Sequence, residues 1–199
     1  MWRSVTSSEP RRAAPAVAWL VVAGLAAAAA AEGKVLLSVD EALALAFPGA
    51  TIERRTIYLT PPELARAAEL AGSALPSAIV HPYVAARGSV RIGTAFFDTH
   101  KVRTLAETVM VAVDSTGRVQ RVEVIASDEP PDYLPRATWY EQFGARGLGA
   151  ELALGRAIRN VTGATLTARA TTSAVRRALA LDRIIAQRAV PESRKQVGQ

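Results

Sequence analysis

The sequence contains no cysteine among its 199 residues. Structural disulfides are therefore excluded, and so are zinc or iron–sulfur sites that use thiolate ligands. A haem attached through thioether bonds is excluded for the same reason. The absence does not decide the compartment, because domains outside the cytoplasm can be stable without a disulfide.

Histidine is also scarce, with only His81 and His100 in the chain. Asp98 is close to His100 in sequence, and the two could take part in a metal or acid–base site. The sequence shows no third ligand for a metal, so we expect ordinary surface or loop roles for both histidines. A G-x-S-x-G nucleophile motif is absent, which leaves a hydrolase that uses Asp98 and His100 as the least favoured function.

The chain also lacks a large excess of either positive or negative charge. The whole chain has 24 basic and 18 acidic residues, and its first 31 residues hold three of the basic and one of the acidic ones. The remainder, with 21 basic and 17 acidic residues, carries a net charge of +4. The basic residues are mostly single, whereas nucleic-acid binding requires them to cluster on one face. We expect no nucleic-acid partner.

Residues 1–31 have the pattern of a targeting segment. Arg3, Arg11 and Arg12 precede a run without charge over residues 13–31, and the small residues at 26–31 offer A-x-A cleavage sites. The run is also close to the roughly 20 residues that span a bilayer. The segment is therefore either a signal peptide or an uncleaved membrane anchor. Both alternatives place residues 32–190 in the periplasm or at the extracytoplasmic face of the inner membrane.

The rest of the chain predicts an α+β fold, in which a mostly antiparallel sheet packs against helices. The clearest unit is a β-hairpin of residues 108–113 and 119–125 around an Asp-Ser-Thr-Gly turn. A long C-terminal helix should reach about residue 189 and be followed by a polar tail at 191–199; the arginines expected to face largely outward from it are Arg176, Arg177, Arg183 and Arg188. The other expected elements are helices at 38–47, 60–72 and 151–158, a strand at 51–59, and two strands within 77–99.

Thr162-Gly163-Ala164-Thr165 lies where the long helix is expected to begin. Unpaired amides and the helix dipole favour a negative charge at such a position. Thr162 or Thr165 could cap the free amides, and Gly163 permits a tight turn. A capped helix start without any ligand therefore remains an alternative interpretation of this tetrapeptide.

The same four residues resemble the (Ser/Thr)-Gly-Ala-Thr signature of FMN-binding domains in Rnf and sodium-translocating quinone reductase complexes. The resemblance implies that a flavin transferase joins FMN through its phosphate to Thr165. It also implies that Thr162, Gly163 and Ala164 form the turn at the phosphate and that Thr167 donates a further hydrogen bond. Arg159 stands where this family usually has an aspartate.

Two further stretches bear on the resemblance. The family often carries a Glu-Thr-Pro-Gly stretch that lines the flavin, and Glu129-Pro130 matches part of it. Trp139, Tyr140 and Phe143 follow, and their flat rings suit either stacking on the flavin or a place in the core. The resemblance implies that Glu129 and Trp139 belong to the flavin site, while the core interpretation of the aromatic residues remains open.

These features predict an extracytoplasmic electron carrier with covalently bound FMN, acting as a subunit of a redox chain. Its partners would be a flavin transferase, membrane-bound or periplasmic redox proteins, and the membrane itself if the leader is uncleaved. The alternative is a similar domain without flavin that serves as a periplasmic binding or structural module. Arg159 and the incomplete Glu-Thr-Pro-Gly stretch favour this alternative.

Overall fold

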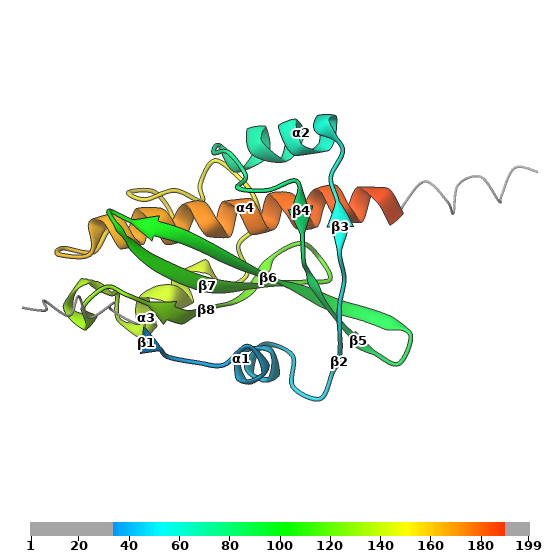
Figure 1. Cartoon of the computed structure of the whole chain (residues 1–199), viewed down its shortest axis with the longest axis horizontal. Coiled ribbons are helices and arrows are strands. Elements are labelled where there is room, and N and C mark those ends of the chain that lie inside the picture. The colour runs from blue at the N-terminus through cyan, green and yellow to red at the C-terminus, as the bar shows by residue number, and fades with distance from the viewer. Residues whose placement is uncertain (1–33, 190–199) are drawn as a thin grey trace, which may run out of the picture. The chain divides into compact units, whose positions relative to one another are not determined.

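The computed structural model describes residues 34–189 (Figure 1). The predicted leader at 1–31 and the predicted tail at 191–199 lie outside the described residues. No helix within residues 34–189 is both long and apolar enough to cross a membrane. The elements are β1 Lys34–Val35, α1 Val39–Ala46, β2 Thr51–Arg54, β3 Ile57–Tyr58, α2 Pro61–Ala71, β4 Ile79–Val80, β5 Tyr83–Arg87, β6 Val90–Val102, β7 Leu105–Asp114, β8 Val119–Ser127, the 3-10 turns η1 Pro131–Tyr133 and η2 Glu141–Phe143, α3 Ala137–Tyr140 and α4 Thr165–Ala189.

Six strands form an antiparallel sheet in the order β1-β8-β7-β6-β5-β2, which confirms the predicted α+β fold. The longest pairing joins β6 to β7, and its register runs from Gly93 opposite Asp114 to Val102 opposite Leu105. The predicted hairpin of β7 and β8 is present, and both strands are longer than expected. The sheet is strongly curled, with β6 and β7 at its centre (Figure 1).

Helices cover both faces of this sheet (Figure 1). Alternate residues of β7 point in opposite directions, so Val109 and Val111 pack on the side of α4 while Met110 packs with α1. Helix α2 packs against α4 on the side away from the sheet. The layers are therefore α1, the sheet, α4 and α2, and the larger core lies between the sheet and α4.

Local signals fix the ends of the first two helices as predicted. Ser38 begins α1 with a complete capping box, in which its amide donates to Glu41 at 2.9 Å and the Glu41 amide donates back at 3.2 Å. The amide and hydroxyl of Thr60 both donate to Glu63 at the start of α2. Gly72 ends α2 in the left-handed conformation, with φ of +70°.

Two predicted elements were wrong. The strand expected at 51–59 is broken, because β2 pairs with β5 in the main sheet whereas β3 pairs with β4 in a separate two-stranded sheet. Between them, the Arg55 amide donates to the carbonyl of Pro82 at 2.9 Å. The helix expected at 151–158 is absent. Gly155 there has φ of +77°, which interrupts a right-handed helix, and the segment forms turns instead.

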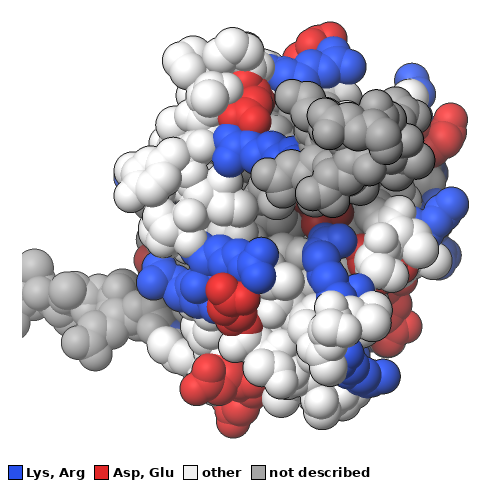
Figure 2. Space-filling model, turned by 90° about the vertical axis from the view of Figure 1, so that its right-hand side faces the viewer, with Lys and Arg blue, Asp and Glu red and all other residues white. Residues whose placement is uncertain are grey.

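Figure 2 shows the end of the domain on the right of Figure 1, where basic and acidic side chains are interspersed. Arg55 pairs with Glu53 at 2.7 Å, and Arg188 at the end of α4 pairs with Glu63. Both pairs are partly exposed to solvent and hence contribute little to stability. On this face, charge is balanced locally and does not form a patch of one sign.

Candidate functional site

The turn that precedes α4 is tight and glycine-dependent. Gly163 has φ of +87°, a conformation that residues with a Cβ atom rarely adopt. The Ala164 amide donates to the carbonyl of Val161 at 3.2 Å, and the Ala164 carbonyl accepts the first helical bond from Ala168 at 2.9 Å. Ala164 is therefore the residue that flanks the helix, and Thr165 is its first residue.

Neither threonine caps this helix, so the capping prediction was wrong. The hydroxyl of Thr165 turns back and donates to the carbonyl of Val161 at 3.1 Å. Thr162 is exposed and makes no side-chain hydrogen bond within the described residues. Alanine at 164 has no oxygen with which to cap the helix. As a result, no side chain in the described part of the chain accepts from the first-turn amides of α4, and these amides remain available to an anion.

A small cavity of about 170 Å³ opens beside this turn. Glu129 reaches it from the loop after β8, and Thr165 and Thr167 reach it from α4. Five of the seven predicted site residues meet here, whereas Thr162 and Trp139 do not line the cavity. The lining consists of Val102, Arg103, Glu129, Tyr133, Gly163, Ala164, Thr165, Leu166 and Thr167.

Thr167 is almost fully buried and fixes one wall of the cavity. Its hydroxyl donates to the carbonyl of Tyr133 at 2.9 Å, which ties η1 to the first turn of α4. The Tyr133 side chain is 42% exposed, and the guanidinium of Arg103 lies 5.7 Å from the centre of its ring. Arg103 has φ of +54° in the short turn between β6 and β7, a strained conformation for a residue other than glycine.

Arg103 was missed by sequence reasoning, because only the pairing of β6 with β7 brings its turn next to α4. Glu129 was expected, and its carboxylate makes no side-chain hydrogen bond within the described residues although the residue is 8% exposed. Its amide donates to the hydroxyl of Ser127 at 3.1 Å, which holds the loop at the end of β8. The carboxylate can therefore accept hydrogen bonds from hydroxyl or N–H groups inside the cavity.

The aromatic residues occupy the core. Trp139 packs edge-to-face on Tyr140 and Phe143, with ring centres 5.1 and 5.2 Å apart. Its indole N–H donates to the carbonyl of Arg159 at 2.7 Å, and the Arg159 amide donates to Gln142 at 2.9 Å. Of the two interpretations left open by the sequence, the structure supports the core. It also shows that Trp139 positions the chain that leads into the Thr165 turn.

A second and larger hollow, of about 740 Å³, lies on the other side of Thr165. It is lined by Arg156, Arg169 and Arg176 among others, and no acidic residue lines it. Arg169 follows Thr165 by four residues and therefore lies on the same face of α4, one turn further along. Thr165 thus stands between a cavity with a carboxylate and a hollow with three guanidinium groups.

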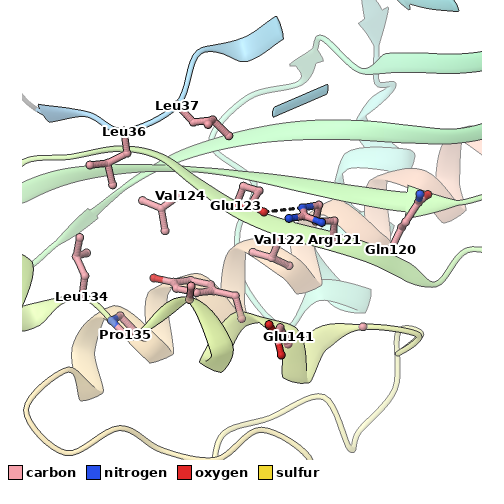
Figure 3. A pocket seen from close by; sticks show the side chains of 13 residues that line it. Leu36, Leu37, Gln120, Arg121, Val122, Glu123, Val124, Leu134, Pro135 and Glu141 are labelled. Atoms are coloured by element: carbon pink, nitrogen blue, oxygen red, sulfur yellow. Dashed lines mark hydrogen bonds and ion pairs between the residues drawn. The ribbon is translucent and has the colours of Figure 1, made fainter. Parts of the chain in front are cut away.

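The hollow in Figure 3, of about 520 Å³, is separate from this site. It lies between β8 and residues 134–144, and Leu36, Leu37, Val122 and Val124 give it apolar walls. The Arg121–Glu123 ion pair of 2.5 Å lies along it. None of the predicted site residues lines this hollow. Leu134 borders it while the preceding Tyr133 borders the cavity at Thr165, so the loop separates the two spaces.

His100 forms part of a buried charge network, and the expected surface or loop role was wrong for it. Its Nδ1 lies 3.0 Å from Asp98 and its Nε2 lies 2.9 Å from Glu107. The guanidinium of Arg177 binds both oxygens of Asp98 at 2.7 Å, so Arg177 faces inward and not outward. His81, by contrast, is exposed and lies 3.2 Å from the hydroxyl of Thr56.

The network fixes the charges of its members. Burial is the largest influence on the pKa of His100 and lowers it, but hydrogen bonds and charges from Asp98 and Glu107 outweigh it and raise the pKa to about 9. Burial raises the pKa of Asp98, yet hydrogen bonds from His100 and Arg177 lower it to about 2. At neutral pH the network therefore holds an imidazolium beside a carboxylate. The described residues contain no group of three or more ligands that could hold a metal ion.

Comparison with known families identifies the region around this site. Residues 106–180 match the family model of the FMN-binding domain. The matched segment begins in β7, ends in α4 and contains Glu129, Trp139 and the whole Thr162–Thr167 stretch. The FMN-binding domain match supports a flavin-binding protein. Searches of curated proteins and of solved structures found no match for this chain.

The residues at the site fit FMN. Uncapped amides at the start of α4 suit a phosphate, and Glu129 suits the hydroxyl and N–H donors of the cofactor. The cavity of about 170 Å³ is smaller than the ~300 Å³ at the lower end of ordinary ligand sites, so it can enclose only part of a flavin. FMN, when bound, supplies an electron-accepting ring, and the protein supplies its position and electrostatic surroundings.

Proposed function

We propose that this protein is an extracytoplasmic electron carrier, with FMN joined through its phosphate to Thr165. The observation that carries the proposal is the placement of Thr165. Its hydroxyl stands at the first residue of α4, beside uncapped amides, and the residue borders both the Glu129 cavity and the arginine-lined hollow. The residue lies inside the segment that matches the FMN-binding domain.

Attachment would use the Thr165 hydroxyl as the acceptor of the FMN phosphoryl group. The bond from Oγ1 to phosphorus forms as the bond between that phosphorus and the leaving group of the transferase's activated flavin donor breaks, and the leaving group takes up the hydroxyl proton. In the ester bond, Oγ1 is bonded to phosphorus and no longer carries a proton, so its hydrogen bond to Val161 is lost. The phosphodiester carries a negative charge at the positive end of the helix dipole. Arg169, one turn along the same face, supplies a second compensating charge from the hollow.

The loop and the turn then hold the rest of the cofactor. Glu129 accepts hydrogen bonds in the cavity, and the exposed side chains of Tyr133 and Leu166 offer flat or apolar surface beside it. Electrons pass between the flavin and redox proteins of the membrane or periplasm. A covalent bond prevents the loss of a dissociating flavin to the medium outside the cytoplasm.

The alternative proposal is a domain of the same fold that works without flavin. Arg159 in place of an aspartate favours it, because the exposed guanidinium lies just before the turn that a flavin transferase would have to recognise. The backbone gives no sign of disturbance, since the amide and carbonyl of Arg159 are both hydrogen-bonded. The side chain, and not the shape of the turn, is therefore the feature that separates the two proposals.

Expression of the full chain in a host with a flavin transferase tests the attachment. We expect the intact mass to increase by one FMN less one water and the protein band to fluoresce in a denaturing gel. Thr165→Ala should remove both signals, whereas Thr51→Ala, at an exposed residue of β2 outside the signature, should retain them. If the wild-type protein has an unmodified mass although the transferase is active, the attachment proposal is wrong and the flavin-free alternative stands.

The same expression experiment tests in which cell compartment the protein is located. The uncharged run after Arg3, Arg11 and Arg12 supports export. We expect the flavin-labelled protein in the periplasmic or membrane fraction, and deletion of residues 1–31 should leave an unlabelled protein in the cytoplasm. Labelled protein in the cytoplasmic fraction of wild-type cells would contradict the extracytoplasmic assignment.

A further inference from the structure

The charge network of Asp98, His100, Glu107 and Arg177 is buried at the interface between the sheet and α4. The side chains of Asp98, His100 and Arg177 are only 11–12% exposed, and that of Glu107 is completely buried. One carboxylate oxygen of Glu107 accepts from the Thr171 hydroxyl at 3.4 Å and faces His100 at 2.9 Å. The other oxygen has no hydrogen-bond partner. Such a costly arrangement is hard to explain as packing alone, because apolar residues fill such a space at lower cost.

Three elements place this network directly beneath the cavity at Thr165. On β6, His100 precedes the cavity residue Val102 by two positions and therefore shares its face. On α4, Thr171 follows the cavity residue Thr167 by one helical turn. At the end of β8, Ser127 pairs with Glu107 and also holds the amide of the cavity residue Glu129.

Each of these elements thus contributes one residue to the cavity wall. It also contributes a second residue, further from the cavity, that belongs to the charge network or contacts a member of it. The network extends from there to a small hollow of about 120 Å³ on the other side, which Asp98 and Arg177 line. Glu107 and His100 therefore lie between the Asp98–Arg177 ion pair and the cavity.

We propose that His100 and Glu107 form a proton-binding pair coupled to the flavin, which holds its proton more tightly when the flavin carries an added electron. This inference rests on the proposed attachment of FMN at Thr165. The electron comes from a protein redox partner, and the proton comes from solvent through the Asp98 side. A negative charge added above the pair stabilises the imidazolium, since the cavity floor and α4 keep water away from it.

His100 Nε2 lies 2.9 Å from a carboxylate oxygen of Glu107, so the charge of each side chain acts directly on the other. With its pKa raised to about 9 by Asp98 and Glu107, His100 is already protonated at neutral pH. Coupling then becomes visible only at alkaline pH, where the oxidised form loses the proton first. The other titratable or charged groups around the pair are Asp98 from β6, Arg177 from α4, Tyr140 from α3, Asp128 and Glu129 from the loop after β8, and Arg103 from the β6–β7 turn. Glu123 from β8 acts on Tyr140.

Nuclear magnetic resonance of the two histidines tests the coupling directly, because the chain has only His81 and His100. In the flavin-loaded full chain, we expect the pH midpoint of His100 to rise by about one pH unit when the flavin is reduced, the order expected for a unit charge added nearby at an effective dielectric of about 20. His81 should titrate identically in both states. A His100 titration that is unchanged by reduction would overturn the proposal.

The midpoint potential gives a second readout that a purely structural network would not change. Wild-type protein should show an additional fall of the potential with pH above about 9, and the double variant H100Q/E107Q should lack it. The two glutamine side chains can still form hydrogen bonds but carry no charge. If the double variant does not fold, E107Q alone is used in its place. The matched control is His81→Gln, which should behave as wild type. An identical pH profile in the folded variants would also overturn the coupling.

Failure of the proposed attachment is distinguishable from failure of the coupling. A wild-type protein without the mass of FMN overturns both, since there is then no flavin beside the pair. A protein that carries FMN on Thr165 but shows no redox-dependent titration of His100 overturns only the coupling.

Discussion

The hydroxyl of Thr167 donates a hydrogen bond of 2.9 Å to the carbonyl of Tyr133, 34 residues earlier in the chain. This bond joins the first turn of α4 to the loop that carries Glu129 and Tyr133. Because Thr167 is 2% exposed, water cannot readily replace the hydroxyl. The distance between the helix start and the loop, and with it the width of the cavity, depends on this contact.

Thr167→Val should loosen the loop while keeping the shape of the side chain. Removal of the donor leaves the Tyr133 carbonyl without its partner, so we expect a loss of about 1–2 kcal/mol of unfolding free energy. The loop should also become more sensitive to limited proteolysis. Thr172→Val is the matched control, since its buried hydroxyl donates only to Ala168 in the same helix. Equal protease sensitivity of the two variants would show that Thr167 does not hold the loop.

Trp139→Phe should weaken the approach to the Thr165 turn. A phenyl ring replaces the larger indole, so the bond of 2.7 Å to the Arg159 carbonyl is lost and a small cavity is left in the core, and we expect about 2 kcal/mol of destabilisation in chemical denaturation. Flavin attachment should fall in parallel, because the backbone at Arg159 is released. Tyr140→Phe is the control, since it removes a buried hydroxyl that has no partner and should leave stability unchanged or higher. The interpretation fails if Tyr140→Phe is the more damaging change.

Arg159→Asp should increase flavin attachment, if the side chain limits recognition by the transferase. The Arg159 backbone is fixed by Trp139 and Gln142, so the substitution should not change stability by more than about 0.5 kcal/mol. The labelled fraction is measured by intact mass at equal transferase levels. Arg183→Asp, also exposed but far from the Thr165 turn on α4, controls for a simple change of net charge. An equal effect of both substitutions would assign it to charge alone.

Arg169→Gln should affect the flavin-loaded protein more than the flavin-free one. In the loaded protein, Arg169 faces the phosphodiester one turn away, and loss of such an exposed charge contact costs roughly 0.3–1 kcal/mol. We therefore expect a lower thermal midpoint only when flavin is attached, and a smaller difference at high salt. Arg183→Gln, exposed and far along the same helix, is the control. A similar loss in the Thr165→Ala background would contradict a role at the phosphate.

The His100 network predicts how stability depends on pH. The pKa of His100 is raised from 6.5 to about 9, so its contribution is fully present below pH 6.5 and is lost as pH rises through 9. The pKa of Asp98 is lowered from 3.8 to about 2, so its contribution is present above pH 3.8 and is lost as pH falls through 2. Urea unfolding between pH 6 and 10 should show a fall on the order of 3 kcal/mol in wild type. His100→Gln should flatten this fall, and an unaltered fall would assign it to other groups.

The first two helices, the β7–β8 hairpin and the start of α4 could be predicted because short-range chemistry decides each of them. Ser38 and Glu41 cap α1 within four residues, and Gly163 makes its turn wherever the chain goes afterwards. The failures have long-range causes. The strand at 51–59 was broken because its halves pair with different partners, and Gly155 outweighed the apolar spacing at 151–158.

By itself, the sequence determined where α4 begins, the glycine turn at Gly163 before it and the presence of Glu129 in the preceding loop, because these depend on residue type at fixed spacing. The tertiary structure alone decided that Trp139 lies in the core, that Arg103 reaches the cavity, and that His100, Glu107 and Arg177 meet beneath it. Those residues come from separate strands and a helix. Their charges and contacts arise only when the curled sheet packs against α4 and excludes water from between them.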